Sequence, residues 1–341
     1  MVKVLIIDDS AFMRKKITEI LNKDNDLDVV GSARDGAEGL LMIEQLKPDV
    51  ITLDINMPKM DGLTCLAIIS EKFKIPVVML SSLTQEGELA TFEALELGAV
   101  DFIAKPGGTI SRNLDLIEEE IRFKVKAASM AKGNDRKVTG QKQRPQRKPK
   151  IIKPRHIVES FSEENFPVVV IGLSTGGPRT IFEVLPQFQR DINFAVVVVQ
   201  HIPQGFSESL ADRISKECNF DFKLAGNRDI IEPGKGYLAP GGLHLTMNGL
   251  KGARPNSISL SRYPSDTSFI PSVDVTFTSF AKHFGKRCIG VVMTGMGVDG
   301  TQGASCIKEV GGTTIAEHED TCVVYGMPKS LVDSILADYI C

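Results

Sequence analysis

The chain contains no apolar segment long enough to cross a membrane. Its 341 residues are 42% hydrophobic, yet none of its apolar runs approaches the ~20 residues of a transmembrane helix. The N-terminus does not have the pattern of a signal peptide, because Asp8 and Asp9 directly follow the first apolar run. We therefore expect a cytoplasmic protein without membrane insertion.

The chain also lacks paired cysteine motifs. None of its cysteines forms a C-x-x-C pair or has a metal-binding spacing. We expect free thiols in a reducing compartment, which argues against a disulfide-stabilised fold. The cysteines are Cys65, Cys218, Cys288, Cys306, Cys322 and Cys341.

Basic residues outnumber acidic residues in only one of three segments, at the centre of the chain. Residues 1–123 carry 13 basic and 22 acidic residues, and residues 156–341 carry 15 basic and 20 acidic. Residues 124–155 carry 12 basic and 1 acidic. This segment is also rich in Gln, Pro, Gly and Ser, so it cannot bury enough apolar surface to fold. We predict two domains, at 1–123 and 161–341, and a flexible basic linker at 124–160 that is either a solvated tether or a contact for an acidic surface.

The second predicted domain lacks the signatures of two binding classes. It shows no helix-turn-helix pattern, and its acidic charge does not suit a DNA-binding face. Its glycine-rich turn, Gly172–Gly177, has neither the G-K-[ST] of a P-loop nor G-x-G-x-x-G. We do not expect nucleic-acid binding, and a DNA- or nucleotide-binding output domain is kept as the alternative to an enzyme.

Short apolar runs alternate with amphipathic stretches through both domains. This alternation predicts an α/β fold in each: a doubly wound (βα)5 domain first, and then a doubly wound domain with a mostly parallel sheet. Leu243–Met247 and Ser257–Ser261 predict a hairpin that turns through Asn248–Gly249. The predicted strands are Val4–Ile7, Val29–Ser32, Val50–Leu53, Val77–Leu80, Phe102–Ala104, Val168–Ile171, Ala195–Gln200, Gly236–Ala239 and Cys288–Thr294. The predicted helices are Ala11–Leu21, Gly36–Leu46, Gly62–Phe73, Gly87–Leu97, Leu114–Val125, Pro178–Leu185, Phe206–Glu217 and Thr301–Val310.

Polar residues follow the predicted strands of the first domain. Asp8 and Asp9 end the first strand, and Asp54 ends the third. Ser81 and Lys105 end the fourth and fifth. Because the ends of neighbouring parallel strands converge, we expect these side chains to share one site. Three close carboxylates repel unless a divalent cation neutralises them, and hard oxygen ligands suit Mg²⁺.

Four segments carry these residues: Ile6–Ser10, Leu53–Gly62, Ser81–Ser82 and Phe102–Pro106. With them, residues 1–123 resemble response-regulator receiver domains. The resemblance implies that Asp54 accepts a phosphoryl group from a histidine kinase and that Ser81 and Lys105 bind its oxygens. Such a modification adds about −1.5 to −2 charges and new acceptor oxygens.

The same resemblance implies a metal site and a switch residue. Asp8, Asp9 and Asp54 would hold Mg²⁺ together with the backbone carbonyl of Asn56. Phe102 stands where receiver domains often have an aromatic switch residue.

A serine follows the first strand of the second domain within Gly172–Gly176, which reads G-x-S-x-G. Glycines around a serine at a sharp strand-to-helix turn are typical of a nucleophile elbow, so Ser174 is predicted to carry out acyl transfer. His201 ends a second apolar strand and is the candidate base, with His244 as the runner-up. Asp299 ends a third strand in a glycine-rich loop and is the candidate acid. The order Ser, His, Asp differs from the Ser, Asp, His order of α/β-hydrolases.

The second domain is similar to the chemotaxis protein-glutamate methylesterase (CheB) family in several motifs that occur in one order. The motifs are Ile171–Pro178, Gln200–Pro203, Tyr237–Gly241, Pro271–Val275, Met293–Gly300 and Gly326–Pro328. Two features depart from this family: the basic linker is longer than a tether needs, and Asn56 stands where the family often has Glu.

This resemblance implies hydrolysis of glutamate methyl esters on methyl-accepting chemotaxis receptors, and deamidation of receptor glutamines. It implies Ser174 as nucleophile, His201 as base and Asp299 as its orienting acid. The Met296 backbone N–H would stabilise the oxyanion, with Thr175 nearby. The enzyme would need no cofactor for the esterase reaction and would be recruited to receptor clusters. We also expect the unphosphorylated receiver to cover the Ser174 site until phosphorylation weakens the contact.

Overall fold

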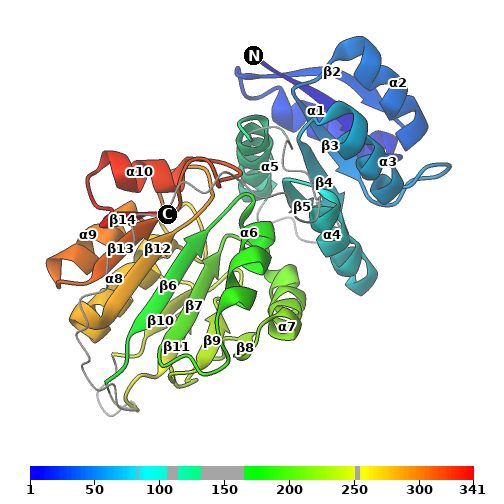
Figure 1. Cartoon of the computed structure of the whole chain (residues 1–341). Helices are drawn as coiled ribbons and strands as arrows, with labels where there is room; N and C mark the ends of the chain where they lie inside the picture. Colours follow the sequence, from blue (N-terminus) through cyan, green and yellow to red (C-terminus); the bar gives the residue numbers. More distant parts are fainter. Residues whose placement is uncertain (83, 106–113, 132–164, 250–253) are drawn as a thin grey trace, which may run out of the picture.

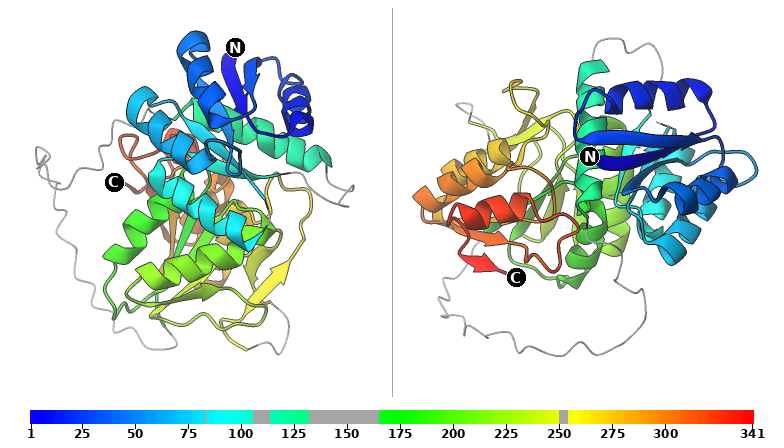
Figure 2. Two further views of the ribbon diagram at one scale, coloured as in Figure 1. Left: turned by 90° about the vertical axis from the view of Figure 1, so that its right-hand side faces the viewer. Right: turned by 90° about the horizontal axis from the view of Figure 1, so that it is seen from above.

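A computed structural model describes residues 1–82, 84–105, 114–131, 165–249 and 254–341. Most of the predicted basic linker, at 124–160, lies outside these residues. Two α/β domains lie side by side, with α5 (Leu114–Ser129) between them (Figures 1 and 2). Among the described residues, no helix is both long and apolar enough to span a bilayer.

The first domain contains a five-stranded parallel sheet in the order β2-β1-β3-β4-β5. Its central strands are buried throughout and mostly apolar, as expected when helices cover both faces of a parallel sheet. The predicted (βα)5 arrangement is confirmed. The strands are β1 (Val2–Ile7), β2 (Leu27–Ala33), β3 (Val50–Asp54), β4 (Val77–Ser81) and β5 (Asp101–Ala104), and the remaining helices are α1 (Ala11–Leu21), α2 (Gly36–Leu46), α3 (Gly62–Ile68) and α4 (Gln85–Leu97).

Helix α5 ends at Ser129, beyond the predicted helix end at Val125 and the predicted start of the linker at 124. Val125 and Ala128 are buried in the apolar cluster of the first domain. Lys124 resembled the start of the basic segment, but its ammonium is buried between Asp101 and Glu120, at 3.2 Å from each carboxylate. The last helix of this domain therefore includes residues whose basic character suggested a linker.

The second domain contains a seven-stranded parallel sheet in the order β14-β13-β12-β6-β7-β9-β8. Its mostly parallel character is confirmed. The strands are β6 (Val168–Leu173), β7 (Ala195–Gln200), β8 (Asp221–Leu224), β9 (Lys235–Leu238), β12 (Cys288–Val292), β13 (Thr313–Ala316) and β14 (Tyr339–Ile340), and the helices are α6 (Gly177–Val184), α7 (Ser207–Glu217), α8 (Val273–Phe284), α9 (Thr301–Glu309) and α10 (Met327–Asp333).

A separate antiparallel hairpin consists of β10 (His244–Met247) and β11 (Ile258–Ser261). The prediction of a hairpin is confirmed, but the predicted turn at Asn248–Gly249 is wrong. Met247 pairs with Ile258, so the connection runs from 248 to 257, and part of it lies outside the described residues. A local Asn-Gly signal did not set the length of this loop.

The domains meet along α4, β5 and α5 of the first domain. Phe102 on β5 packs against Phe206, with ring centroids 4.5 Å apart. Arg213 on α7 lies over the ring of Phe92 on α4 and pairs with Glu96 on the same helix. One apolar cluster contains buried residues from both domains, so this contact is a packed interface and not a surface touch.

Candidate active site

Ser174 lies at the tight turn between β6 and α6, at the carboxyl edge of the sheet. Gly176 adopts φ +80°, a conformation that favours glycine. Gly172 is also required, because a Cβ there would lie 2.4 Å from a methyl carbon of Val273. The two glycines of the motif thus let the strand turn sharply and let α8 approach closely. Ser174 itself is 3% exposed.

The structure brings Ser174, His201 and Asp299 into one hydrogen-bonded chain. Nδ1 of His201 lies 3.1 Å from the Ser174 hydroxyl oxygen, and Nε2 lies 2.8 Å from Oδ2 of Asp299. Because an ionised carboxylate only accepts hydrogen bonds, Nε2 carries the proton and Nδ1 presents a lone pair to the hydroxyl. This geometry suits proton abstraction from Ser174.

Asp299 is held at the N-terminus of α8. Its Oδ1 accepts hydrogen bonds from the Ser272 hydroxyl and the Asp274 N–H, both at 2.9 Å, and its Oδ2 accepts one from the Val273 N–H at 2.8 Å. Burial alone would raise the pKa of Asp299, but its hydrogen bond and charge interaction with His201, followed by these N–H groups, lower it to about 2. The carboxylate therefore stays ionised beside the imidazole, aided by the helix dipole.

The carboxyl of Asp274 ties the Asp299 loop to α8. Its Oδ1 accepts hydrogen bonds from the N–H groups of Gly300 and Gly303, at 3.0 and 2.6 Å. Burial raises the pKa of Asp274 to about 6, and the charge of Asp299 adds to the effect while the two N–H groups oppose it. The pKa of Asp274 is thus raised and the pKa of Asp299 is lowered, because only Asp299 is bonded to a histidine.

We expect Asp274→Asn to stabilise the protein near pH 7 and to lose this effect in acid. A folded pKa of about 6 lies above the ordinary 3.8, so Asp274 contributes stability below pH 3.8 and loses it as the pH rises through 6. Asparagine keeps an acceptor oxygen without the charge, so the gain above pH 6 should be about 1–2 kcal/mol. Thermal unfolding from pH 4 to 8, with the exposed Asp266→Asn as control, measures it. A difference in Tm that does not vary with pH would contradict this expectation.

Gln200 is a residue whose role the sequence did not predict. It is 3% exposed, and its Nε2 donates hydrogen bonds to the backbone carbonyls of Ser174 and His201, at 2.9 and 3.1 Å. A Cβ at Gly177 would lie 2.0 Å from its Oε1, so glycine is needed there too. One amide therefore holds the backbones of Ser174 and His201 in register. Its position beside His201 in the motif was the only sequence signal.

Gln200→Met is expected to lower kcat about tenfold or more. Methionine has a similar length and bulk but leaves two buried carbonyls without this donor, a loss of about 1–3 kcal/mol. Ester hydrolysis and thermal unfolding should be measured together, with the exposed Gln204→Met as the matched control. A variant that is less stable but keeps the wild-type kcat would show that Gln200 does not position the site.

The loop after β12 lies against Ser174. A Cβ at Gly295 would be 2.8 Å from the Cβ of Ser174, and the Gly295 N–H donates to the carbonyl of Val324. Thr294 binds the elbow directly, because its hydroxyl donates to the carbonyl of Thr175 at 2.9 Å. Within the described ranges, the N–H groups of Met296 and Thr175 donate to no protein acceptor. These two groups can therefore donate to a substrate oxygen.

His244, the runner-up base, does not contact Ser174. It is fully buried, and its Nδ1 accepts the Ser272 N–H at 3.1 Å while Nε2 donates to the carbonyl of Pro264 at 2.9 Å. Burial lowers its pKa. It anchors the loop before α8.

The predicted acidic cluster of the first domain is also assembled. Oxygens of Asp8, Asp9 and Asp54 lie within 4.8 Å of one another, and the Lys105 ammonium lies 3.1 Å from Asp8 and 2.7 Å from Asp54. Burial raises the pKa of Asp54 although Lys105 opposes the shift. Three carboxylates beside one ammonium leave net negative charge, and an all-oxygen donor set fits a hard divalent cation such as Mg²⁺. The Asn56 N–H donates to Asp54 at 3.3 Å.

Ser81 faces α4 instead of Asp54. Its hydroxyl lies 3.0 Å from the carbonyl of Gly87 and 2.7 Å from the hydroxyl of Thr91. It is fully buried. Binding a phosphoryl oxygen at Asp54 would require this hydroxyl to leave its α4 partners.

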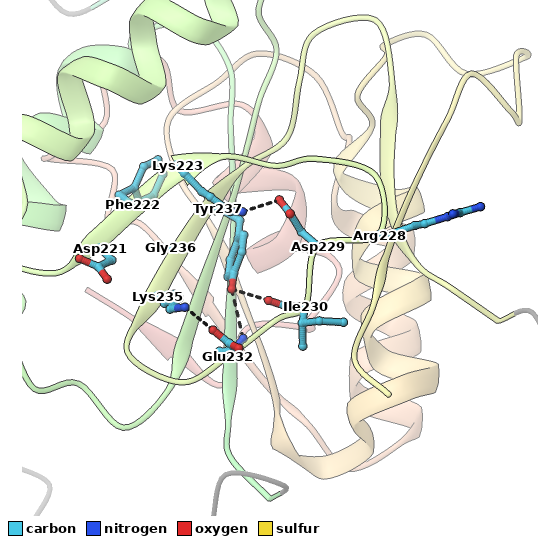
Figure 3. Close-up of a pocket in the computed structure, with 10 residues that line it drawn as sticks. All are labelled: Asp221, Phe222, Lys223, Arg228, Asp229, Ile230, Glu232, Lys235, Gly236 and Tyr237. Atoms are coloured by element: carbon cyan, nitrogen blue, oxygen red, sulfur yellow. Dashed lines mark hydrogen bonds and ion pairs between the residues drawn. The ribbon is translucent and has the colours of Figure 1, made fainter. Parts of the chain in front are cut away.

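A separate cavity of about 390 Å³ lies at the β8–β9 edge of the second sheet (Figure 3). Its charged groups are largely paired with one another: Lys223 with Asp229 at 2.8 Å, and Lys235 with Glu232. The Tyr237 hydroxyl donates to a backbone carbonyl inside it. It contains none of the predicted site residues.

Comparisons with known proteins match both halves of the chain. The CheB methylesterase family matches residues 169–341, and the response regulator receiver domain family matches residues 4–113. The protein-glutamate methylesterase/protein-glutamine glutaminase of Pyrococcus horikoshii is 41% identical over 99% of this chain and 90% of its own length. The protein of the same name from Lawsonia intracellularis is 42% identical over 100% of this chain and 96% of its own.

A solved structure, the Thermotoga maritima CheB methylesterase catalytic domain, is 39% identical and covers 52% of this chain and 92% of that one, with a TM-score of 0.49. The relatives align along nearly the whole chain, across both the receiver and the catalytic half. This chain therefore belongs to the CheB methylesterase family and carries an N-terminal response-regulator receiver domain.

Proposed function

We propose that this protein hydrolyses glutamate methyl esters on chemotaxis receptors and deamidates receptor glutamines, and that phosphorylation of Asp54 activates it. The observation that carries the proposal is the hydrogen-bonded chain from Ser174 through His201 to Asp299 at the carboxyl edge of the sheet. The names of the relatives supply the two substrates, a protein glutamate ester and a protein glutamine. A DNA- or nucleotide-binding output is not favoured, because the second half belongs to an esterase family.

In the proposed mechanism, the Ser174 oxygen attacks the ester carbonyl while Nδ1 of His201 takes the hydroxyl proton. The imidazolium is stabilised by Asp299, whose low pKa keeps it charged. The proton then passes to the leaving methoxide, which departs as methanol. His201 next takes a proton from water while the water oxygen attacks the acyl carbon. The bond to Ser174 then breaks, the proton passes from His201 to the Ser174 oxygen, and the product glutamate leaves and ionises. A glutamine reacts in the same way and releases ammonia.

The N–H groups of Met296 and Thr175 are the proposed oxyanion donors. Both belong to loops held next to Ser174 through Thr294 and Gly295. A donor of this kind is typically worth about 3 kcal/mol in the transition state. Because backbone groups do this work, substitution of either side chain should not remove the donor.

In the receiver, Asp8, Asp9, Asp54 and the Asn56 carbonyl are the proposed Mg²⁺ ligands. The metal would neutralise carboxylate and phosphoryl charge there. Asp54 would accept the phosphoryl group from a histidine kinase, and the ammonium of Lys105, already 2.7 Å from Asp54, would move to its oxygens. Burial alone would lower the pKa of Lys105, but the two carboxylates beside it raise it, so it stays charged.

The proposed regulation uses the packed interface between the domains. Ser81 holds the first two turns of α4 through Gly87 and Thr91, and α4 contacts the catalytic half through Arg213. When the Ser81 hydroxyl turns to a phosphoryl oxygen, it releases α4, so the docked receiver loosens. An interface change of about 1.4 kcal/mol alters the open population tenfold.

The test is methanol release from methylated receptor membranes, with and without acetyl phosphate and Mg²⁺. We expect release by the wild type to increase with the phosphoryl donor, and release by Asp54→Ala to stay at the basal rate. Ammonia release from receptors with glutamine at the same sites tests the second activity. Wild-type protein that releases no methanol under either condition would refute the proposed function.

A further inference from the structure

Phe269 is an aromatic residue that the mechanism above does not use, although it touches the catalytic histidine. It lies in the loop between β11 and α8. Its ring is stacked on the His201 imidazole, with centroids 4.1 Å apart and planes at 12°. The ring therefore covers one face of the base and limits how far the imidazole can tilt from the line between Ser174 and Asp299.

The same ring is in contact with the receiver. Phe123 on α5 meets Phe269 edge to face, with centroids 5.1 Å apart and planes at 61°. Phe123 also reaches the loop after β12, because a Cβ at Gly297 would lie 3.9 Å from its ring. Phe269 thus lies between the receiver and His201. If the docked receiver obstructs the site, substrate must approach from this side.

The backbone of the Phe269 loop is anchored without the receiver. The Thr267 hydroxyl donates to the Phe269 carbonyl at 2.9 Å, and His244 binds the Pro264 carbonyl and the Ser272 N–H on either side. If the receiver leaves, these bonds persist and the side chain of Phe269 loses its contact with Phe123. Its ring is then the part of the loop that can turn.

We propose that Phe269 is a positioning residue that couples receiver docking to the catalytic imidazole. While the receiver is docked, Phe123 holds the Phe269 ring against His201 and closes that face to substrate. Undocking frees the ring to turn away and opens the face. The proposal rests on the proposed esterase function and names the contact through which phosphorylation acts on its base.

The experiment compares methanol release by the full-length chain with and without acetyl phosphate. Phe269→Leu keeps an apolar side chain but removes both ring contacts. It should raise the basal rate about two- to tenfold, the range for one aromatic pair, and reduce the activation ratio by the same factor. Phe123→Leu should do the same. The double variant should be no more active than either single one, because both remove the same contact.

Two variants serve as controls. Arg213→Ala weakens the interface at α4, away from His201, so its effect should multiply with that of Phe269→Leu. Phe269→Tyr retains the ring and should keep the wild-type activation ratio. A purely structural role would instead lower the rate of Phe269→Leu equally with and without donor. That result would overturn the coupling. So would a double variant, Phe123→Leu with Phe269→Leu, whose basal rate rises by the product of the two single increases. Failure of the esterase proposal is a separate result, since the wild type would then release no methanol.

Discussion

Ser174→Ala should release no methanol above background, a loss of about 10⁴-fold or more. Without the hydroxyl there is no nucleophile for the ester, and the neighbouring donors and binding contacts retain only a small residual rate. The substitution removes one oxygen from a 3% exposed site and leaves the hydrogen bond from the Ser174 N–H to the Thr294 carbonyl in place. The fold and the thermal midpoint should therefore stay close to those of the wild type.

Methanol should be measured with donor present, so that the receiver does not limit the rate. Ser265→Ala, at an exposed serine of the loop before α8, is the matched control and should behave like wild type. Substantial release by a folded Ser174→Ala protein would exclude Ser174 as the nucleophile. The receiver assignment would survive that result, because it depends on Asp54 and its neighbours.

Asp299→Asn should lower kcat by about 10³- to 10⁴-fold. An amide in place of the carboxylate can donate to Nε2 of His201, which shifts the ring proton to Nδ1 and points it at the Ser174 oxygen. The base is then blocked although the geometry is nearly unchanged. With its nitrogen toward His201, the amide also leaves the Val273 N–H without an acceptor, and its oxygen is a neutral acceptor for the Asp274 N–H in place of a charged one.

The measurements are kcat and KM with donor present, together with thermal unfolding, and the exposed Asp266→Asn serves as control. We expect the loss to lie in kcat, with KM little changed, because Asp299 acts through His201 and not on the substrate. A loss below tenfold would show that another group orients the imidazole. Asp274, whose N–H binds Asp299 from the first turn of α8, is the carboxyl to test next.

Helix α8 (Val273–Phe284) was not predicted from the sequence pattern. Its first six residues, Val273–Thr278, alternate apolar and polar side chains and are rich in β-branched and aromatic types, which favour a strand. Tertiary contacts override this preference: Ser272 caps the helix, and Phe277 and Phe280 are buried in the core. The prediction found the motif at Pro271–Val275 but not the helix that holds Asp299.

The burial of Lys124 and the role of Gln200 were not predicted, for a related reason. A lysine beside a basic segment reads as solvent-exposed, yet Lys124 is paired inside the receiver with Asp101, a residue 23 positions earlier. Gln200 reads as the end of a strand, yet its amide joins two backbone carbonyls that meet only in the folded sheet. In each case one partner is distant in sequence: Asp101 for Lys124 and Ser174 for Gln200.

By itself, the sequence determined the two α/β domains and the residue types at the ends of their strands. That was possible because hydrophobic periodicity and strand-end position are local properties, and parallel strands bring their carboxyl ends together whatever the loops do. Only the tertiary structure decided which nitrogen of His201 faces Ser174, how Asp299 is held by α8, and that Phe123 and Phe269 connect the receiver to the imidazole. Those features depend on side-chain packing between segments far apart in the chain, which no local pattern encodes.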